Sequence, residues 1–308
     1  MSAALLALRQ TVSRRLPLRP WRRLAGAAIT GSGLVLLLLS LAQSLAALPG
    51  AVQAALAVTL GTALATGAGA LPVLVLRRIT ARQNAALLGV GAGVMLAATA
   101  FSLVLPGLEA AQATFAGLGV PLFAMAVVTG GALLMALDRL LPHSHFSSGP
   151  VVSHAGHARL ARRVRGVWLF VMAIGLHNLP EGLAVGVSVG AGDAGAAALS
   201  LGIALQNLPE GLVVAMALAG LGYRPGQATL VALATGLLEP VGGLLGATLV
   251  QGAAAWLPLG LGLAAGAMLY AVCHEVIPEA HRGGHETAAT SGLLLGFAVM
   301  IALDASLT

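Results

Sequence analysis

Two copies of one polar hexapeptide stand inside long apolar stretches of this chain. The first copy reads HNLPEG and covers residues 177–182, and the second reads QNLPEG and covers 206–211. His177 and Glu181 are four positions apart, so both lie on one face of a helix, and the second copy repeats this spacing. A further acid occurs in LLEPVGG. These stretches supply seven candidate metal ligands: His177, Asn178, Glu181, Gln206, Asn207, Glu210 and Glu239.

The residue types in this set are those that bind divalent transition metals. Imidazole and carboxylate groups suit zinc, iron and similar ions, whereas copper(I) prefers a cluster of thiolate or thioether ligands, which the sequence does not offer. Three carboxylates brought together without a cation repel one another, and a divalent ion removes that repulsion. Bridging carboxylates with flanking amides could hold two ions close together.

Two other interpretations of these polar groups stay open. Amides and acids can join membrane helices by hydrogen bonds alone, and buried acids can also relay protons. Amides would join helices without the help of three acids, so metal binding is the preferred interpretation.

The elements that carry these residues are predicted to be membrane-spanning helices. Hydrophobic residues make up 58% of the chain and charged residues 8%, a balance outside the range of soluble domains. A hydrocarbon core about 30 Å thick needs about 20 apolar residues per helix. This length predicts an all-α polytopic bundle of nine segments: 24–48, 51–76, 84–105, 120–138, 166–190, 196–220, 226–250, 257–279 and 288–307.

The predicted metal ligands are expected to lie near the middle of the bilayer. An ionisable side chain inside a membrane helix costs at least about 2.5–3.5 kcal/mol, so a functional role is its default interpretation. His177, Gln206 and Glu239 each fall about half-way along their predicted segments. Pro180, Pro209 and Pro240 lie within three positions of them and cannot sit in an unbroken helix, which predicts bent helices with room for a ligand.

The basic residues predict the orientation of the chain. All 16 are arginines, and with nine segments every one of them falls on the same side, opposite Glu109 and Asp193. The positive-inside rule then places the amino terminus in the cytoplasm and the carboxyl terminus outside. The basic balance therefore indicates topology in a lipid bilayer and excludes nucleic acid as the expected partner. The first segment is longer than the apolar part of a signal peptide, so it is expected to stay as a helix. Cys273 is the single cysteine, which excludes an internal disulfide.

HNLPEG, QNLPEG and LEPVGG on three consecutive segments resemble the signature helices of the ZIP (Zrt/Irt-like) family of divalent-metal transporters. The resemblance implies an eight-helix transporter domain over 51–308, with 24–48 as an extra helix after a basic cytoplasmic segment, 1–23. A His/Arg-rich cytoplasmic loop, 139–165, would join the fourth and fifth segments. The implied protein is a homodimer of the bacterial inner membrane and not an enzyme.

The resemblance also implies a function and a division of the ligands. Zinc, or alternatively cadmium, iron or manganese, would enter the cytoplasm through a two-metal site as one helix group shifts against another. The first site would use His177, Glu181, Gln206 and Glu210, and the second Asn178, Glu181, Asn207, Glu210 and Glu239. Many relatives have histidine at the place of Gln206, and some have aspartate at that of Asn207. Because an amide is the weaker ligand, this departure bears on the affinity of the second site and on metal selectivity.

The remaining polar groups suggest a path for metal ions through the protein, with an entrance and an exit. An exit on the cytoplasmic side would use His274, Glu275, Glu279 and Asp138, and an entrance on the outer side would use Ser102, Glu109 and Asp304. Cytoplasmic histidines could bind metal loosely or be merely solvated: His143, His145, His154, His157, His281 and His285.

Two enzyme interpretations fail on their chemistry. GVSVG, residues 186–190, matches a serine nucleophile pattern that needs a strand–turn–helix elbow. HEVIP, residues 274–278, has a proline where the metalloprotease motif needs its second histidine. The stronger alternative to metal uptake is a proton-coupled cation exchanger or exporter that uses the same carboxylates.

Overall fold

The computed structural model describes residues 19–76, 79–140, 156–253 and 255–307. All of their regular structure is helical, as the composition predicted, and strands are absent from these ranges. The chain separates into two compact units, 1–49 and 50–308. Much of the predicted basic segment and of the loop 139–165 lies outside the described residues, including Arg9, His143, His145 and His154, and so does Arg77, which follows the second predicted segment.

The first unit contains one long helix, α2 (Arg19–Ala46). Large apolar side chains on it are exposed, among them Ile29 and Leu36. Its apolar part, Leu24–Leu37, overlaps the first predicted segment.

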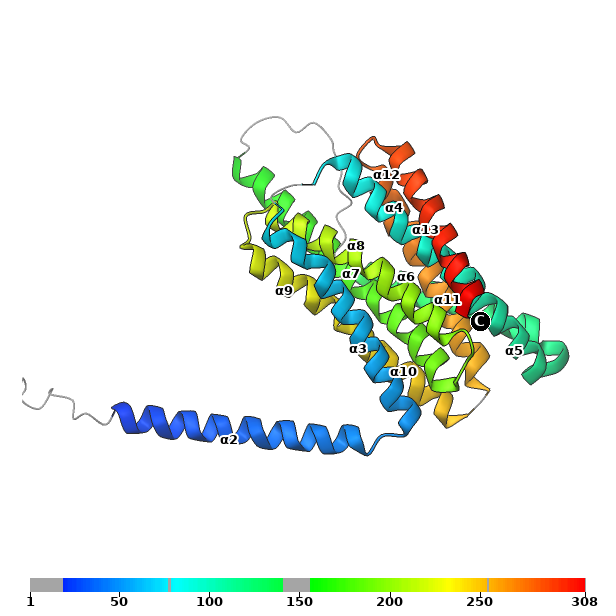
Figure 1. The fold of residues 1–308 in the computed structure, drawn as a ribbon, viewed down its shortest axis with the longest axis horizontal. Helices are drawn as coiled ribbons and strands as arrows, with labels where there is room; N and C mark the ends of the chain where they lie inside the picture. The colour runs from blue at the N-terminus through cyan, green and yellow to red at the C-terminus, as the bar shows by residue number, and fades with distance from the viewer. Residues whose placement is uncertain (1–18, 77–78, 141–155, 254, 308) are drawn as a thin grey trace, which may run out of the picture. The chain divides into compact units, whose positions relative to one another are not determined.

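The second unit contains the remaining helices (Figure 1). In chain order these are α3 (Gly50–Ala70), η1 (Leu71–Leu74), α4 (Ala81–Ala97), η2 (Ala98–Val104), α5 (Leu105–Phe115), η3 (Ala116–Leu118), α6 (Gly119–Leu140), α7 (Gly156–Ala191), α8 (Ala196–Ala219), α9 (Pro225–Gly236), α10 (Leu238–Gly252), α11 (Trp256–Ala271), η4 (Val272–Val276), α12 (Ile277–His281) and α13 (Glu286–Leu307).

Seven helical stretches of the described residues are long and apolar enough to cross a membrane, fewer than the nine predicted. One of the seven, Ala81–Arg139, contains two predicted segments. The chain reverses within it: Ala116 has a positive φ of 47°, Gly119 packs on the backbone of Ala111, and Gly107 packs on Phe123. The other difference is the first predicted segment, 24–48: the apolar stretch of α2 that overlaps it is too short to count among the seven.

The helices of the second unit form two groups. In one, α3 packs along α8 and α10 packs along α7, with α9 against α3. In the other, α4 packs along α13 and α6 along α11. The groups meet mainly where α4 contacts α8 and α11 contacts α7. A buried apolar cluster fills this junction, with Val94, Leu199, Met268 and Met300 among its members.

The glycine that ends each hexapeptide is a point of close helix contact. A Cβ at Gly182 of α7 would clash with the backbone of Glu239 on α10. A Cβ at Gly211 of α8 would clash in the same way with the backbone of Thr66 on α3. Small residues let membrane helices approach backbone to backbone. The motif glycines therefore bring the ligand-bearing helices together.

The three prolines act differently. Pro180 and Pro209 lie inside α7 and α8, which continue through them. The predicted segment 226–250, by contrast, is two helices that break at Leu237, just before Glu239. Pro240 has no N–H to donate to the carbonyl of Gly236, which accounts for a break at this point. Near the end of the next span, His274 and Glu275 lie in a π-helical turn, η4.

Candidate metal site

The seven predicted ligands come from three helices. α7 carries His177, Asn178 and Glu181, α8 carries Gln206, Asn207 and Glu210, and α10 carries Glu239. Six of them are buried, and Glu210 is half-buried. Burial of so many ionisable and amide groups within apolar helices is costly unless they are paired with partners or a ligand.

Side chains of α8 link the acids of the two neighbouring helices. The Gln206 amide nitrogen donates to Oε1 of Glu181 on α7. Nδ2 of Asn207 donates to Oε1 of Glu239 on α10 at 2.8 Å. The carboxylate of Glu210 lies close enough to interact electrostatically with those of Glu181 and Glu239. Three acids from three helices therefore meet at one place.

Each of the seven residues keeps a buried polar atom that has no hydrogen-bond partner among the described residues. These atoms are Nδ1 and Nε2 of His177, Nδ2 and Oδ1 of Asn178, Oε2 of Glu181, Oε1 of Gln206, Oδ1 of Asn207, Oε1 of Glu210 and Oε2 of Glu239. Native structures rarely leave buried polar atoms unpaired, and several in one place suggest a ligand. Most of these atoms are oxygens with lone pairs and two are ring nitrogens, which is a suitable donor set for a divalent cation.

The arrangement is not a finished chelate. Within the described ranges, no three His, Cys, Asp or Glu side chains are grouped so that they could hold an ion as they stand. A coordination shell at this place therefore needs side-chain shifts, amide oxygens, or both.

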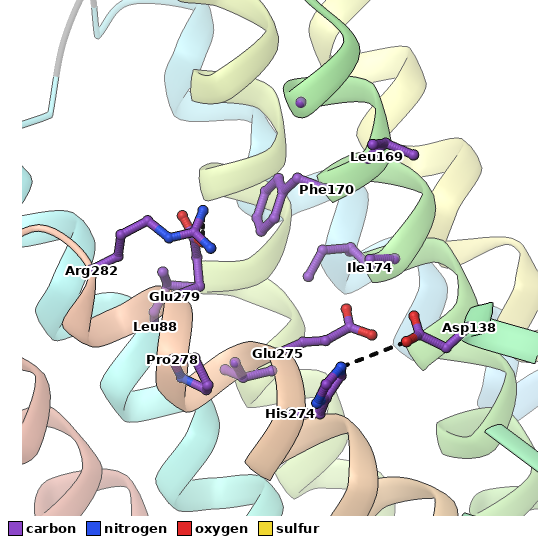
Figure 2. A pocket seen from close by; sticks show the side chains of 13 residues that line it. Leu88, Asp138, Leu169, Phe170, Ile174, His274, Glu275, Pro278, Glu279 and Arg282 are labelled. Atoms are coloured by element: carbon purple, nitrogen blue, oxygen red, sulfur yellow. Dashed lines mark ion pairs between the residues drawn. The ribbon is translucent and has the colours of Figure 1, made fainter. Parts of the chain in front are cut away.

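The four residues of the predicted exit line one cavity (Figure 2). The cavity has a volume of about 130 Å³, and Asp138, His274, Glu275 and Glu279 are in its wall. Nε2 of His274 lies 3.7 Å from Oδ2 of Asp138, and Figure 2 shows the carboxyl groups of Glu275 and Asp138 facing each other. Oε2 of Glu275 also lies 3.5 Å from Nε2 of His177. One residue of the cavity wall thus contacts a predicted metal ligand.

Comparison with known proteins identifies the family. The sequence model of the ZIP zinc transporter family matches residues 143–304, more than half of the chain. The chain belongs to the ZIP family. It is 48% identical to zinc transporter ZIPB of Bordetella bronchiseptica over 288 residues, which cover 92% of this chain and 91% of that protein. It is 43% identical to zinc transporter GufA of Myxococcus xanthus over 79% of this chain and 94% of that protein. Zinc transporter ZupT of Chlorobium luteolum is 34% identical over 80% of this chain and 96% of that protein.

Membership of the ZIP family confirms the resemblance drawn from the two hexapeptides and LEPVGG, all of which lie in the matched region. The polytopic helical fold agrees with it. The roles of the individual residues remain predictions.

Sequence reasoning missed several residues that contact the predicted ligands of this ZIP family member. On α3, the Thr62 carbonyl accepts from Asn207 at 2.9 Å, and the Thr66 hydroxyl lies 3.4 Å from Oε1 of Glu239. Thr59, Thr62 and Thr66 recur at helical spacing on one face, but such threonines are common in membrane helices.

Tyr270 was missed as well. Its hydroxyl donates to Oδ2 of Asp138 at 3.0 Å, and its ring stacks on that of His274 with 4.9 Å between centroids. Tyr270 stands four positions before His274, so their shared helix face was a signal that could have identified it.

The predicted entrance is only partly brought together. The Ser102 hydroxyl donates to Oδ1 of Asp304 at 2.9 Å, which joins η2 to α13. Glu109 is exposed on α5, and the described part of the chain shows no hydrogen bond or ion pair between it and the other two.

Proposed function

We propose that the chain transports divalent transition-metal ions, zinc first, across a membrane into the cytoplasm. The observation that carries the proposal is the approach of Glu181, Glu210 and Glu239 from three helices, next to imidazole and amide atoms that have no hydrogen-bond partner among the described residues. The names of the relatives, all zinc transporters, support zinc as the first ion to test. Cadmium, iron and manganese suit the same oxygen and nitrogen donors.

The proposed site holds two ions that share Glu181 and Glu210. The first ion is bound in addition by His177 and Gln206, and the second by three further residues: Asn178, Asn207 and Glu239. The unpartnered amide oxygens of Gln206 and Asn207 support their part as ligands. Substitution of Glu181 or of Glu210 would therefore remove a ligand from both ions at once.

The proposed route ends on the cytoplasmic side. The cavity that starts at Glu275 reaches Arg282, whose Nη1 lies 2.9 Å from Oε2 of Glu279. Arginines mark the cytoplasmic side of a membrane protein, so the position of Arg282 supports exit toward the cytoplasm. Ions would enter at the opposite end, near Ser102, Glu109 and Asp304.

Alternating access is the proposed mode of movement. All seven proposed ligands lie in one helix group, on α7, α8 and α10, while the second group contains α4, α6, α11 and α13. The groups meet mainly where α4 contacts α8 and α11 contacts α7, and one group would move past the other at this junction. We place the protein in the bacterial inner membrane with its amino terminus in the cytoplasm, and as a homodimer, on the family resemblance and the arginine pattern.

The enzyme interpretations have no support in the fold. Ser188 of GVSVG is buried inside α7 and donates to Oδ2 of Asp193 at 2.8 Å, far from the geometry of a nucleophile elbow. Pro278 of HEVIP lies in α12. Transport of metal is therefore the function to test.

The test is zinc flux into liposomes that contain the purified protein, with zinc, cadmium, iron and manganese also offered in competition. Glu181→Ala and Glu210→Ala should each reduce zinc flux to the background of protein-free liposomes, because each removes a carboxylate shared by both ions. Glu286→Ala, at the start of α13 and outside the site, is the matched control and should keep its flux. Near-normal flux in either site variant would contradict the shared-carboxylate site. Protons that move in fixed ratio against zinc would support the exchanger alternative.

A further inference from the structure

The two amides of α8 make the same kind of contact with different helices. Gln206 donates to Glu181 on α7, and its neighbour Asn207 donates to Glu239 on α10. Both contacts join an uncharged N–H donor to a buried acid, and all four side chains are at most 1% exposed. Adjacent residues of α8 therefore donate hydrogen bonds to one acid on α7 and to another on α10.

The direction of the Asn207 amide follows from its surroundings. Its Nδ2 lies 2.9 Å from the backbone carbonyl oxygen of Thr62 and 2.8 Å from Oε1 of Glu239. A backbone carbonyl can only accept a hydrogen bond, so the atom that faces it must be the nitrogen. Both N–H groups of Asn207 are thus used, and its Oδ1 has no partner among the described residues.

An amide donor to a buried acid matters most when no cation is present. A carboxyl group removed from water loses its hydration, and N–H donors replace part of that loss without adding charge. Oε2 of Glu181 and Oε2 of Glu239 are left without hydrogen-bond partners in the described structure, so an ion can approach both acids from that side.

We propose that Gln206 and Asn207 form an amide clamp, whose N–H groups stabilise Glu181 and Glu239 in the metal-free protein. The clamp thereby allows the protein without bound metal to return to the conformation that binds the next ion. The proposal rests on the proposed function, since only a carrier has an empty return step. An acid in place of Asn207 would replace a neutral amide ligand with a carboxylate and strengthen metal binding. It would also leave Glu239 facing a carboxyl group in place of an N–H donor, which disfavours the metal-free state.

The experiment compares two fluxes in the same liposomes. Net zinc uptake into zinc-free liposomes requires the empty return, whereas exchange of labelled zinc against equal unlabelled zinc does not. The variants are Asn207→Asp and Asn207→Leu, a neutral side chain of similar size. The control is Gln251→Glu, because Gln251 is another amide that donates to a backbone carbonyl, that of Gly190 at 2.7 Å, away from the site.

The clamp predicts that the ratio of net uptake to exchange falls about tenfold in both Asn207 variants, the change expected when a buried hydrogen bond loses its donor. Zinc should bind more tightly to Asn207→Asp but not to Asn207→Leu. The ratio should stay unchanged in Gln251→Glu. Equal loss of both fluxes, which leaves the ratio unchanged, would overturn the clamp and assign Asn207 a structural role.

A second measurement does not depend on transport. Asn207→Asp should lower the Tm of the metal-free protein more than the Tm of the zinc-loaded protein, because the new carboxyl group faces Glu239 without a donor in the empty site but binds the ion in the loaded one. Equal shifts in the two states would overturn the clamp. Absence of zinc flux in the unsubstituted protein, together with unequal Tm shifts, would instead contradict the proposed function and keep the clamp as a binding device.

Discussion

At the scale of single residues, His177 stands between two groups of polar side chains. It is 2% exposed, and it shares a helix face with Glu181 while its Nε2 lies 3.5 Å from Glu275. Glu275 in turn lines the cavity that leads to Arg282. If His177 binds the ion as proposed, its contact with Glu275 joins the site to the exit cavity, and we expect ions to leave by way of this imidazole.

We expect His177→Ala to weaken zinc binding and to change metal preference, since the remaining ligands would be oxygens, which favour manganese relative to zinc. Competition of zinc, cadmium, iron and manganese for the purified variant measures this. Glu286→Ala, at the start of α13 and outside the site, should leave the preference as it is. Unchanged selectivity in His177→Ala would remove His177 from the site.

Residue types and spacing were enough to select the acids, amides and histidine that we propose as ligands, and their role stays a prediction. They could not identify Thr62, because it contributes a backbone carbonyl, which every residue has. The contact between His177 and Glu275 was equally hidden, since the two residues are 98 positions apart and meet only because α11, which leads into η4, packs against α7. Sequence spacing therefore predicts the contacts within a helix and leaves those between helices to the fold.

At the scale of helices, the site depends on how closely α7 and α10 approach. Gly182 and Gly186 on α7 face the backbone of α10, and Gly242 and Gly246 on α10 face the backbone of α7. Four glycines thus remove the side-chain layer that normally separates two helices. Glu239 reaches the α7 ligands because of this contact.

Gly182→Ala should therefore lower both stability and zinc binding. The added methyl would clash with the backbone of Glu239, and relief of such a clash by helix displacement costs about 1–3 kcal/mol. Thermal unfolding in detergent, followed by zinc titration, measures both effects. Gly91→Ala on α4 is the control, because a Cβ there meets no atom within 4 Å, and it should raise the Tm slightly. A Gly182→Ala protein as stable as the Gly91→Ala protein would show that α7 and α10 can separate at no cost.

Most helices could be predicted from apolar length, and the errors have local causes. Apolar length alone gives one segment from 226 to 250, but Pro240 predicted an interruption inside it, and the structure breaks this segment at Leu237. The reversal at Ala116 was expected between two segments, but it occurs within one nearly continuous helical stretch.

At the scale of the whole molecule, zinc uptake should depend on pH. Imidazole and carboxyl groups must be free of protons to bind a metal, so protons compete with zinc at every ligand. Uptake at fixed free zinc should therefore fall as the pH is lowered from 8 to 5, with the KM for zinc rising more than the maximal rate changes. The measurement uses equal pH on both sides of the liposome membrane. A flat profile would indicate that the ligands bind zinc without releasing protons.

The backbone contacts between α7 and α10 have a consequence for energetics. Close contact at four glycines resists sliding of the two helices along each other, so in the proposed transport cycle we expect the spacing between Glu181 and Glu239 to stay the same as their group moves. A carrier of this kind presents the same ligand geometry to an ion at both faces of the bilayer. Its affinity would then be equal on the two sides, and the difference in free zinc between the two compartments would set the direction of flow.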